Sequence, residues 1–77
     1  MWIEENNSLV RHFVFSNFAE AFAFLNQIAE ITEKHQHHAE ITNVYNRVSL
    51  RFNTHDAGNI VTDKDRIITA EIDLLLF

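Results

Sequence analysis

The chain is short, acidic and free of cysteine, and these properties exclude several classes of protein. We assign its 77 residues to a single domain, 1–77, whose six Lys and Arg against eleven Asp and Glu give a net charge of −5. Nucleic-acid-binding domains usually carry a basic face, so this balance argues against that class. Disulfides and thiolate metal sites are excluded, and a core this small is expected to need support from a partner subunit.

Neither a membrane span nor a signal peptide is expected. No apolar run approaches the roughly 18 residues that a transmembrane helix needs. Residues 1–5 lack the basic segment and the apolar stretch of a secretory signal. We therefore expect a soluble, cytoplasmic protein, a location that the absence of cysteine also suits.

A β-hairpin is predicted at the start of the chain. Residues 2–5 can form a short strand, residues 6–8 are a turn signal, and residues 9–15 alternate in polarity. The apolar side chains expected on one face of the second strand are Leu9, Phe13 and Phe15, with Arg11 interrupting them.

A helix is predicted directly after the hairpin. Asn17 can serve as the N-cap, and Glu20 follows three residues later, as in a capping box. Apolar residues then recur at helical spacing in a stripe that we expect to pack on the core: Phe18, Ala21, Phe22, Leu25, Ile28 and Ala29. Phe24 and Ile31 lie on a second stripe, which could face a partner subunit.

Two strands are predicted in the second half of the chain. Residues 33–40 are polar and break the helical pattern, whereas residues 41–44 are short and prone to β-structure, with a turn at residues 45–46. The clearest half-buried strand follows, because apolar and polar residues alternate through Val48, Leu50 and Phe52.

A second helix is predicted after a loop over residues 54–61. Thr62 with Asp65 three residues later resembles another capping box. The apolar residues of this helix cover more than one stripe: Ile67, Ile68, Ala70, Ile72, Leu74, Leu75, Leu76 and Phe77. The order ββαββα predicts an α+β fold, a four-stranded antiparallel sheet with two helices packed on one face.

Three of the five histidines lie in one short segment, at positions 35, 37 and 38. Histidine titrates near neutral pH, so it can both give and take a proton there. The segment follows a helix end and His55 follows a strand end, so these side chains could converge. From the residues alone three interpretations stay open: exposed histidines without a role, a metal site of His35, His37 and His38, and a proton-transfer site.

The spacing around these histidines resembles the signature of the pterin-4a-carbinolamine dehydratases. The matching positions are Glu33, His37, His38, Tyr45, His55 and Asp65. Shorter matches to that family are Phe13-x-Phe15-x-x-Phe18, Ala21-Phe22-x-Phe24, Asn43-Val44-Tyr45-Asn46 and Thr54-His55, and the resemblance runs from Trp2 to about Ile72. The chain departs from the family pattern at Ala39, where proline is usual, and it starts after an N-terminal segment that many members carry.

The resemblance implies dehydration of 4a-hydroxytetrahydrobiopterin to a quinonoid dihydropterin and water, a step that supports tetrahydrobiopterin recycling. It implies a pterin substrate, no cofactor and no metal. The catalytic residues it implies are His37, His38 and His55, with His38 and His55 as the base and the acid in an unassigned order. His37 would also bind the substrate or share the acid role, and Glu33, on the substrate-binding side, would orient a histidine.

Other polar residues of the signature and its surroundings receive structural interpretations. We interpret Asp65 as a helix-capping residue and Tyr45 as a residue that shapes its turn, and we place His12 and His35 on the surface. The first alternative function is a non-catalytic protein-binding module, because some members of the family bind a transcription factor through helical surfaces. The second is a protein that binds a divalent metal through its histidines.

A homo-oligomer, at least a dimer, is also expected. Four short strands leave two sheet edges, and no proline blocks pairing along them. The last helix carries more apolar residues than one core-facing stripe needs. The family is known for dimers that join sheets at their edges and for tetramers that pack through helices, so both states are open.

Overall fold

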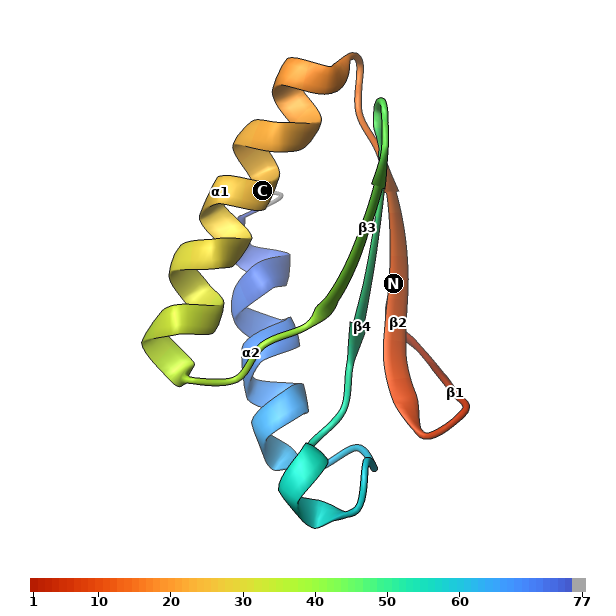
Figure 1. The fold of residues 1–77 in the computed structure, drawn as a ribbon, viewed down its shortest axis with the longest axis vertical. Helices are drawn as coiled ribbons and strands as arrows, with labels where there is room; N and C mark the ends of the chain where they lie inside the picture. The colour runs from red at the N-terminus through yellow and green to blue at the C-terminus, as the bar shows by residue number, and fades with distance from the viewer. Residues whose placement is uncertain (76–77) are drawn as a thin grey trace.

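The computed structural model describes residues 1–75, and it has the predicted order of two strands, a helix, two strands and a helix. The elements are β1 (Ile3–Glu5), β2 (Ser8–Val14), α1 (Phe18–His35), β3 (Glu40–Val44), β4 (Arg47–Phe52) and α2 (Asp63–Leu74). The strands form one antiparallel sheet in the order β1-β2-β4-β3, and both helices lie on the same side of it (Figure 1). The predicted α+β fold is confirmed. Within residues 1–75, neither helix could span a lipid bilayer.

The predicted first turn and the predicted N-cap of the first helix are both present in the structure. Asn6 and Asn7 have φ angles of 49° and 62°, so they form the two-residue turn between β1 and β2. At the start of α1, Asn17 accepts a hydrogen bond from the backbone of Glu20, as predicted. The Glu20 carboxylate reaches the backbone N–H of Ser16 and not that of Asn17, so only half of that capping box forms.

The stripe of α1 that packs on the sheet differs from the one predicted. The buried apolar residues of this helix are Ala21, Phe24, Ile28 and Ile31. Phe18 and Phe22, which we expected in the core, are each 47% exposed. The Phe24 ring lies between Phe13 and Phe15, with centroids 4.8 and 5.1 Å away. The buried face thus takes Ala21 and Ile28 from the predicted core stripe and Phe24 and Ile31 from the second stripe, because the sheet contacts the helix between the two.

Arg11 lies on the helix-facing side of β2 and has a partner there. Its guanidinium donates to Asp73 of α2 at 2.8 Å and lies 4.8 Å from the centre of the Phe13 ring. The indole N–H of Trp2 donates to the same Asp73 oxygen at 2.8 Å. These contacts join β2 and the residue before β1 to α2, and they explain why a charged residue interrupts an apolar face.

Three elements end or begin at the same end of the molecule: α1 ends there, β4 ends there and α2 begins there (Figure 1). A short 3₁₀ turn over His55–Ala57 lies inside the segment predicted as a loop. Ile68 and Ile72 bury the inner face of α2, as expected, and Ile67 and Leu74 are exposed. Leu76 and Phe77, predicted to widen its apolar surface, lie outside the described residues.

Candidate active site

A hollow of about 310 Å³ lies at the end where α1, β4 and α2 meet. Its lining residues are Gln36, His37, His38, Asn53, Thr54, His55, Asp56 and Lys64, and we call it the histidine hollow. The structure thus brings His37, His38 and His55 around one space, although they come from two separate segments. Their catalytic roles stay a prediction.

The end of α1 determines where the histidine pair lies. Gln36 has a φ of 49°, a left-handed conformation that reverses the chain after the helix. Its N–H donates to the carbonyl of Glu33, and the N–H of His37 donates to the carbonyl of Thr32. This hydrogen-bonded end turns His37 back toward α2 and leaves His38 one residue further out.

His37 is held by a buried carboxylate, Asp65. The His37 Nε2–H donates to Asp65 Oδ1 at 2.5 Å, and the Asp65 side chain is 0% exposed. Asp65 Oδ2 accepts from the Thr54 hydroxyl at 2.8 Å and from the Thr62 backbone N–H at 2.9 Å. The last of these bonds is part of the predicted capping box. Asp65 therefore caps α2 and also fixes the orientation of the His37 ring, a contact that the sequence interpretation missed.

The pKa of the Asp65 carboxyl lies below its ordinary value. Burial acts to raise this pKa, because it removes the charged form from water. The hydrogen bonds from His37, Thr62 and Thr54, together with the charge of His37, outweigh burial and favour the carboxylate. Since a carboxylate can only accept hydrogen bonds, the proton of this contact belongs to His37 Nε2. Its Nδ1 is left for other partners.

His38 and Glu33 form a second pair, in a more exposed place. The His38 Nε2–H donates to Glu33 Oε1 at 2.5 Å, and the two side chains are 57% and 69% exposed. Glu33 does not line the histidine hollow. Its contact is with Nε2 of His38, and His38 does line the hollow. The expectation that Glu33 orients a histidine agrees with this contact, whereas a direct role in substrate binding stays a prediction.

His55 reaches the hollow from the loop after β4. Its Nδ1–H donates to Asn59 Oδ1 at 3.0 Å, so its Nε2 is left for a ligand. Thr54 and Ile60 close this loop through a backbone hydrogen bond of 2.8 Å, and Gly58 supplies a φ of 91° within it. The loop is therefore a short, hydrogen-bonded unit that holds His55 beside the end of α1.

The histidines do not form a metal cluster in the part of the chain that the structure describes. His35, His37 and His38 contact three different carboxylates, those of Glu71, Asp65 and Glu33. Across residues 1–75, no group of three His, Cys, Asp or Glu side chains converges on one point as metal ligands would. Residues 1–75 therefore supply no three-ligand site for the metal interpretation.

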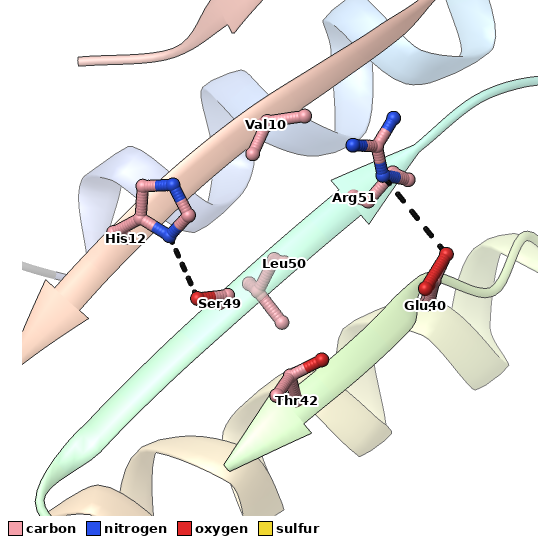
Figure 2. A pocket seen from close by; sticks show the side chains of 7 residues that line it. All are labelled: Val10, His12, Glu40, Thr42, Ser49, Leu50 and Arg51. Atoms are coloured by element: carbon pink, nitrogen blue, oxygen red, sulfur yellow. Dashed lines mark hydrogen bonds and ion pairs between the residues drawn. The ribbon is translucent and has the colours of Figure 1, made fainter. Parts of the chain in front are cut away.

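A second hollow, of about 260 Å³, lies on the sheet face that the helices leave uncovered (Figure 2). We call it the open-face hollow, and its lining residues are Val10, His12, Glu40, Thr42, Ser49, Leu50 and Arg51. His12 Nδ1 and Ser49 Oγ are 2.7 Å apart, and Arg51 Nε lies 3.9 Å from Glu40 Oε2. The sequence analysis placed His12 on the surface but did not predict this hollow.

Lys64 is one of the lining residues of the histidine hollow that the sequence analysis did not single out. It lies in the first turn of α2, next to Asp65, and its side chain lines the histidine hollow. The sequence signal was present but weak, because a lysine near a capping box is ordinary on a helix surface.

Comparisons with known proteins identify the family. A family model described as pterin 4 alpha carbinolamine dehydratase matches residues 1–75. A protein of Thermomicrobium roseum named "Putative pterin-4-alpha-carbinolamine dehydratase" is 50% identical over 64 residues, which are 83% of this chain and 68% of that protein. One of the same name from Prochlorococcus marinus subsp. pastoris is 47% identical over 72 residues, 94% of this chain and 74% of that protein.

Two solved structures share the fold. A crystal structure described as a transcriptional coactivator/pterin dehydratase from Brucella melitensis is 35% identical, with a TM-score of 0.88 over 95% of this chain and 79% of that one. A pterin dehydratase-like protein described as a RuBisCO assembly factor in the alpha-carboxysome is 22% identical, with a TM-score of 0.76 over 97% and 86% of the two chains, and it supports the fold alone. Sequence and structure therefore agree that this chain belongs to the pterin-4a-carbinolamine dehydratase family.

Proposed function

We propose that the chain removes water from 4a-hydroxytetrahydrobiopterin and releases quinonoid dihydropterin, with histidines as the acid and the base. The observation that carries this proposal is the histidine hollow, where His37, His38 and His55 line one space and His37 is anchored to a buried carboxylate. A hollow of about 310 Å³ is within the range of small-molecule sites. The reaction would support the recycling of tetrahydrobiopterin.

The chemistry requires two proton transfers. The carbon–oxygen bond at C4a breaks, and the departing hydroxyl takes a proton to leave as water. The neighbouring ring nitrogen loses a proton to a base, so one water leaves and no oxidation occurs. Groups with a pKa near 7 suit both steps, and each transfer contributes typically 10²–10⁴-fold. This reaction draws on no metal and no organic cofactor.

We assign the two transfers to His38 and His55, with the order left open. Each ring donates one N–H to a protein partner, Glu33 or Asn59, and keeps its other nitrogen for a ligand. A neutral ring presents that nitrogen as a base, and a protonated ring presents it as an acid. The two histidines can therefore exchange the roles of acid and base between turnovers while their hydrogen bonds to Glu33 and Asn59 stay in place.

His37 has a different role in this proposal. Because Asp65 holds its Nε2–H from a buried position, the ring presents Nδ1 in a fixed direction. A fixed ring suits binding near the substrate hydroxyl. In its protonated form the ring would donate Nδ1–H there and stabilise the charge that develops as that group leaves. Asp65 touches no substrate in this scheme and is a positioning residue.

We also propose that the chain forms a homo-oligomer, at least a dimer. Within residues 1–75, the outer edge of β3 pairs with no other strand, and an unpaired edge tends to recruit another strand. Ile67 and Leu74 of α2 are 59% and 74% exposed, which leaves apolar surface for a partner helix. Light scattering at micromolar concentration tests this, and a single species of monomer mass would refute it.

The second candidate function is a protein-binding module without catalysis. Two structural neighbours are described as a transcriptional coactivator/pterin dehydratase and as a RuBisCO assembly factor, so proteins of this fold are linked to association as well as to chemistry. The histidine hollow favours the enzyme, because association through helices or sheet edges has no need of it.

A rate measurement separates the two functions. The absorbance change of 4a-hydroxytetrahydrobiopterin is followed by stopped flow with micromolar protein and in buffer alone. We expect a rate that rises in proportion to protein concentration. A rate equal to that of buffer alone, with protein that is folded by circular dichroism, would leave the binding module as the remaining candidate.

A further inference from the structure

A small hollow of about 110 Å³ opens beside the histidine hollow, between the end of α1 and the start of α2. We call it the side hollow, and its lining residues are His35, His37, Lys64 and Ile67. His37 and Lys64 line both spaces, so the two hollows are neighbours that share a wall. The side hollow is therefore a candidate place for a substituent of a ligand bound in the histidine hollow.

The side hollow combines apolar surface with side-chain nitrogens. Three of its four lining residues carry a side-chain nitrogen, and none of the four is a carboxylate. Two neighbouring carboxylates bond to the residues of this wall or beside it: Asp65 accepts from His37, and Glu71 accepts from His35 at 2.8 Å and from Lys34. The permanent positive charge among the lining residues is that of Lys64.

One donor, Lys64, is unused, and a second, His35, can donate in one of its two states. His35 donates Nε2–H to Glu71, so its other ring nitrogen donates to a ligand only when the ring is protonated. The Lys64 ammonium forms no hydrogen bond or ion pair with the described part of the chain, although it carries three donors. An unused ammonium beside a histidine is suited to a phosphate or carboxylate group.

Another neighbouring space is less suited to an anion. A hollow of about 410 Å³ on the other side of Lys64 is also lined by Asp56 and Asp63, whose charges would repel an anion. Of the two spaces next to the histidine hollow, the smaller one therefore has the favourable charge.

We propose that the side hollow is a subsite for an anionic group on the side chain of the bound pterin, held by Lys64 and His35. This inference rests on the proposed function, and it adds a preference for pterins whose side chain ends in a phosphate or a carboxylate. The group would be recognised by charge-assisted hydrogen bonds, so its binding weakens as salt concentration rises.

Neopterin and neopterin monophosphate test the inference, because they differ only in the terminal phosphate and both are fluorescent. Their dissociation constants are measured by fluorescence titration with the full chain. We expect the wild-type protein to bind the monophosphate about tenfold more tightly, a difference within the range of charge-assisted contacts. Lys64→Gln and His35→Gln should each reduce this ratio toward one. His35 does not line the histidine hollow, so His35→Gln should change the affinity for neopterin little.

Arg66→Gln is the matched control, since it removes one positive charge from the same helix at a residue that lines none of these spaces. It should leave the ratio unchanged. Equal binding of both pterins by the wild-type protein would overturn the inference and leave the proposed function standing. A preference that persists in both test variants would also overturn it. No binding of either pterin would remove the proposed function together with this inference.

Discussion

Two hollows of similar size in the described part of the chain, each lined by histidine and other polar residues, differ in the contacts that support their histidines. The histidine hollow measures about 310 Å³ and the open-face hollow about 260 Å³. In the histidine hollow, His37 donates to Asp65. The Asp65 side chain is 0% exposed, and its carboxylate accepts hydrogen bonds from three donors. In the second, His12 bonds only to Ser49 on an open sheet face.

The contrast shows that hollow size and the presence of histidine do not identify a site. Burying a carboxylate costs free energy unless hydrogen bonds compensate for the lost water. The loss of one of those hydrogen bonds would therefore be unfavourable. A surface hydrogen bond such as that of His12 has no such cost. We therefore base the functional proposal on the three histidines around one hollow together with the buried carboxylate that holds His37.

The largest expected effect is on catalysis in the histidine hollow. His38→Ala or His55→Ala should slow dehydration by at least about tenfold, because a general acid or base contributes typically 10²–10⁴-fold. The stopped-flow rate checks this, with the fold verified by circular dichroism. His12→Ala is the control in the other hollow and should keep the wild-type rate. If all three variants kept it, catalysis would lie elsewhere.

A large effect on stability is expected from Asp65→Ala. Removing one partner of a buried charged pair costs about 3–5 kcal/mol, and here the α2 cap is lost as well. Urea denaturation measures the free energy of unfolding. Asp63→Ala removes an exposed carboxylate from the same turn of α2 and should cost far less. Equal losses in the two variants would show that Asp65 has no special support.

A smaller effect is expected from pH. The pKa of Asp65 is lowered in the folded chain, so its stabilising contribution is complete above its ordinary pKa of about 4 and is lost as pH falls below it. Between pH 6 and pH 3 the wild-type protein should therefore lose more stability than Asp65→Asn. The pKa of Glu71 is also lowered, but Glu71 is present in both proteins and cancels. Parallel losses in the two proteins would contradict the account.

The smallest effect is expected in the open-face hollow. Ser49→Ala breaks the hydrogen bond to His12, yet it should change the free energy of unfolding by no more than about 0.5 kcal/mol. The dehydration rate should stay at the wild-type value. A rate loss comparable to that of His38→Ala would mean that the open-face hollow takes part in catalysis.

The sequence predicted the elements well because their signals are local. Two asparagines mark the first turn, Asn17 and Thr62 mark the helix starts, and alternation marks β4. The packing of α1 was predicted only in part: Ala21 and Ile28 are buried as expected, but the buried face also takes residues from the second stripe, and only the sheet decides where that face lies. Phe24 is buried and Phe22 is exposed for that reason.

The site was only partly predictable for a similar reason. The spacing of His37, His38 and His55 resembles the family signature, and that resemblance carries the whole prediction of their common site. Asp65 was interpreted as a cap alone, since the sequence does not show that the end of α1 lies over the start of α2. The contact between His37 and Asp65 spans 28 residues and exists only in the folded chain.

The most direct test of the central claim asks which histidines a bound pterin touches. Ring ¹H–¹⁵N correlations of all five histidines are recorded while 7,8-dihydrobiopterin is added, with each signal assigned by substitution. The account predicts that the signals of His37, His38 and His55 shift together with one dissociation constant and that the His12 signal stays in place. A shift of His12 with the other three unchanged would place the pterin on the open sheet face and contradict the account.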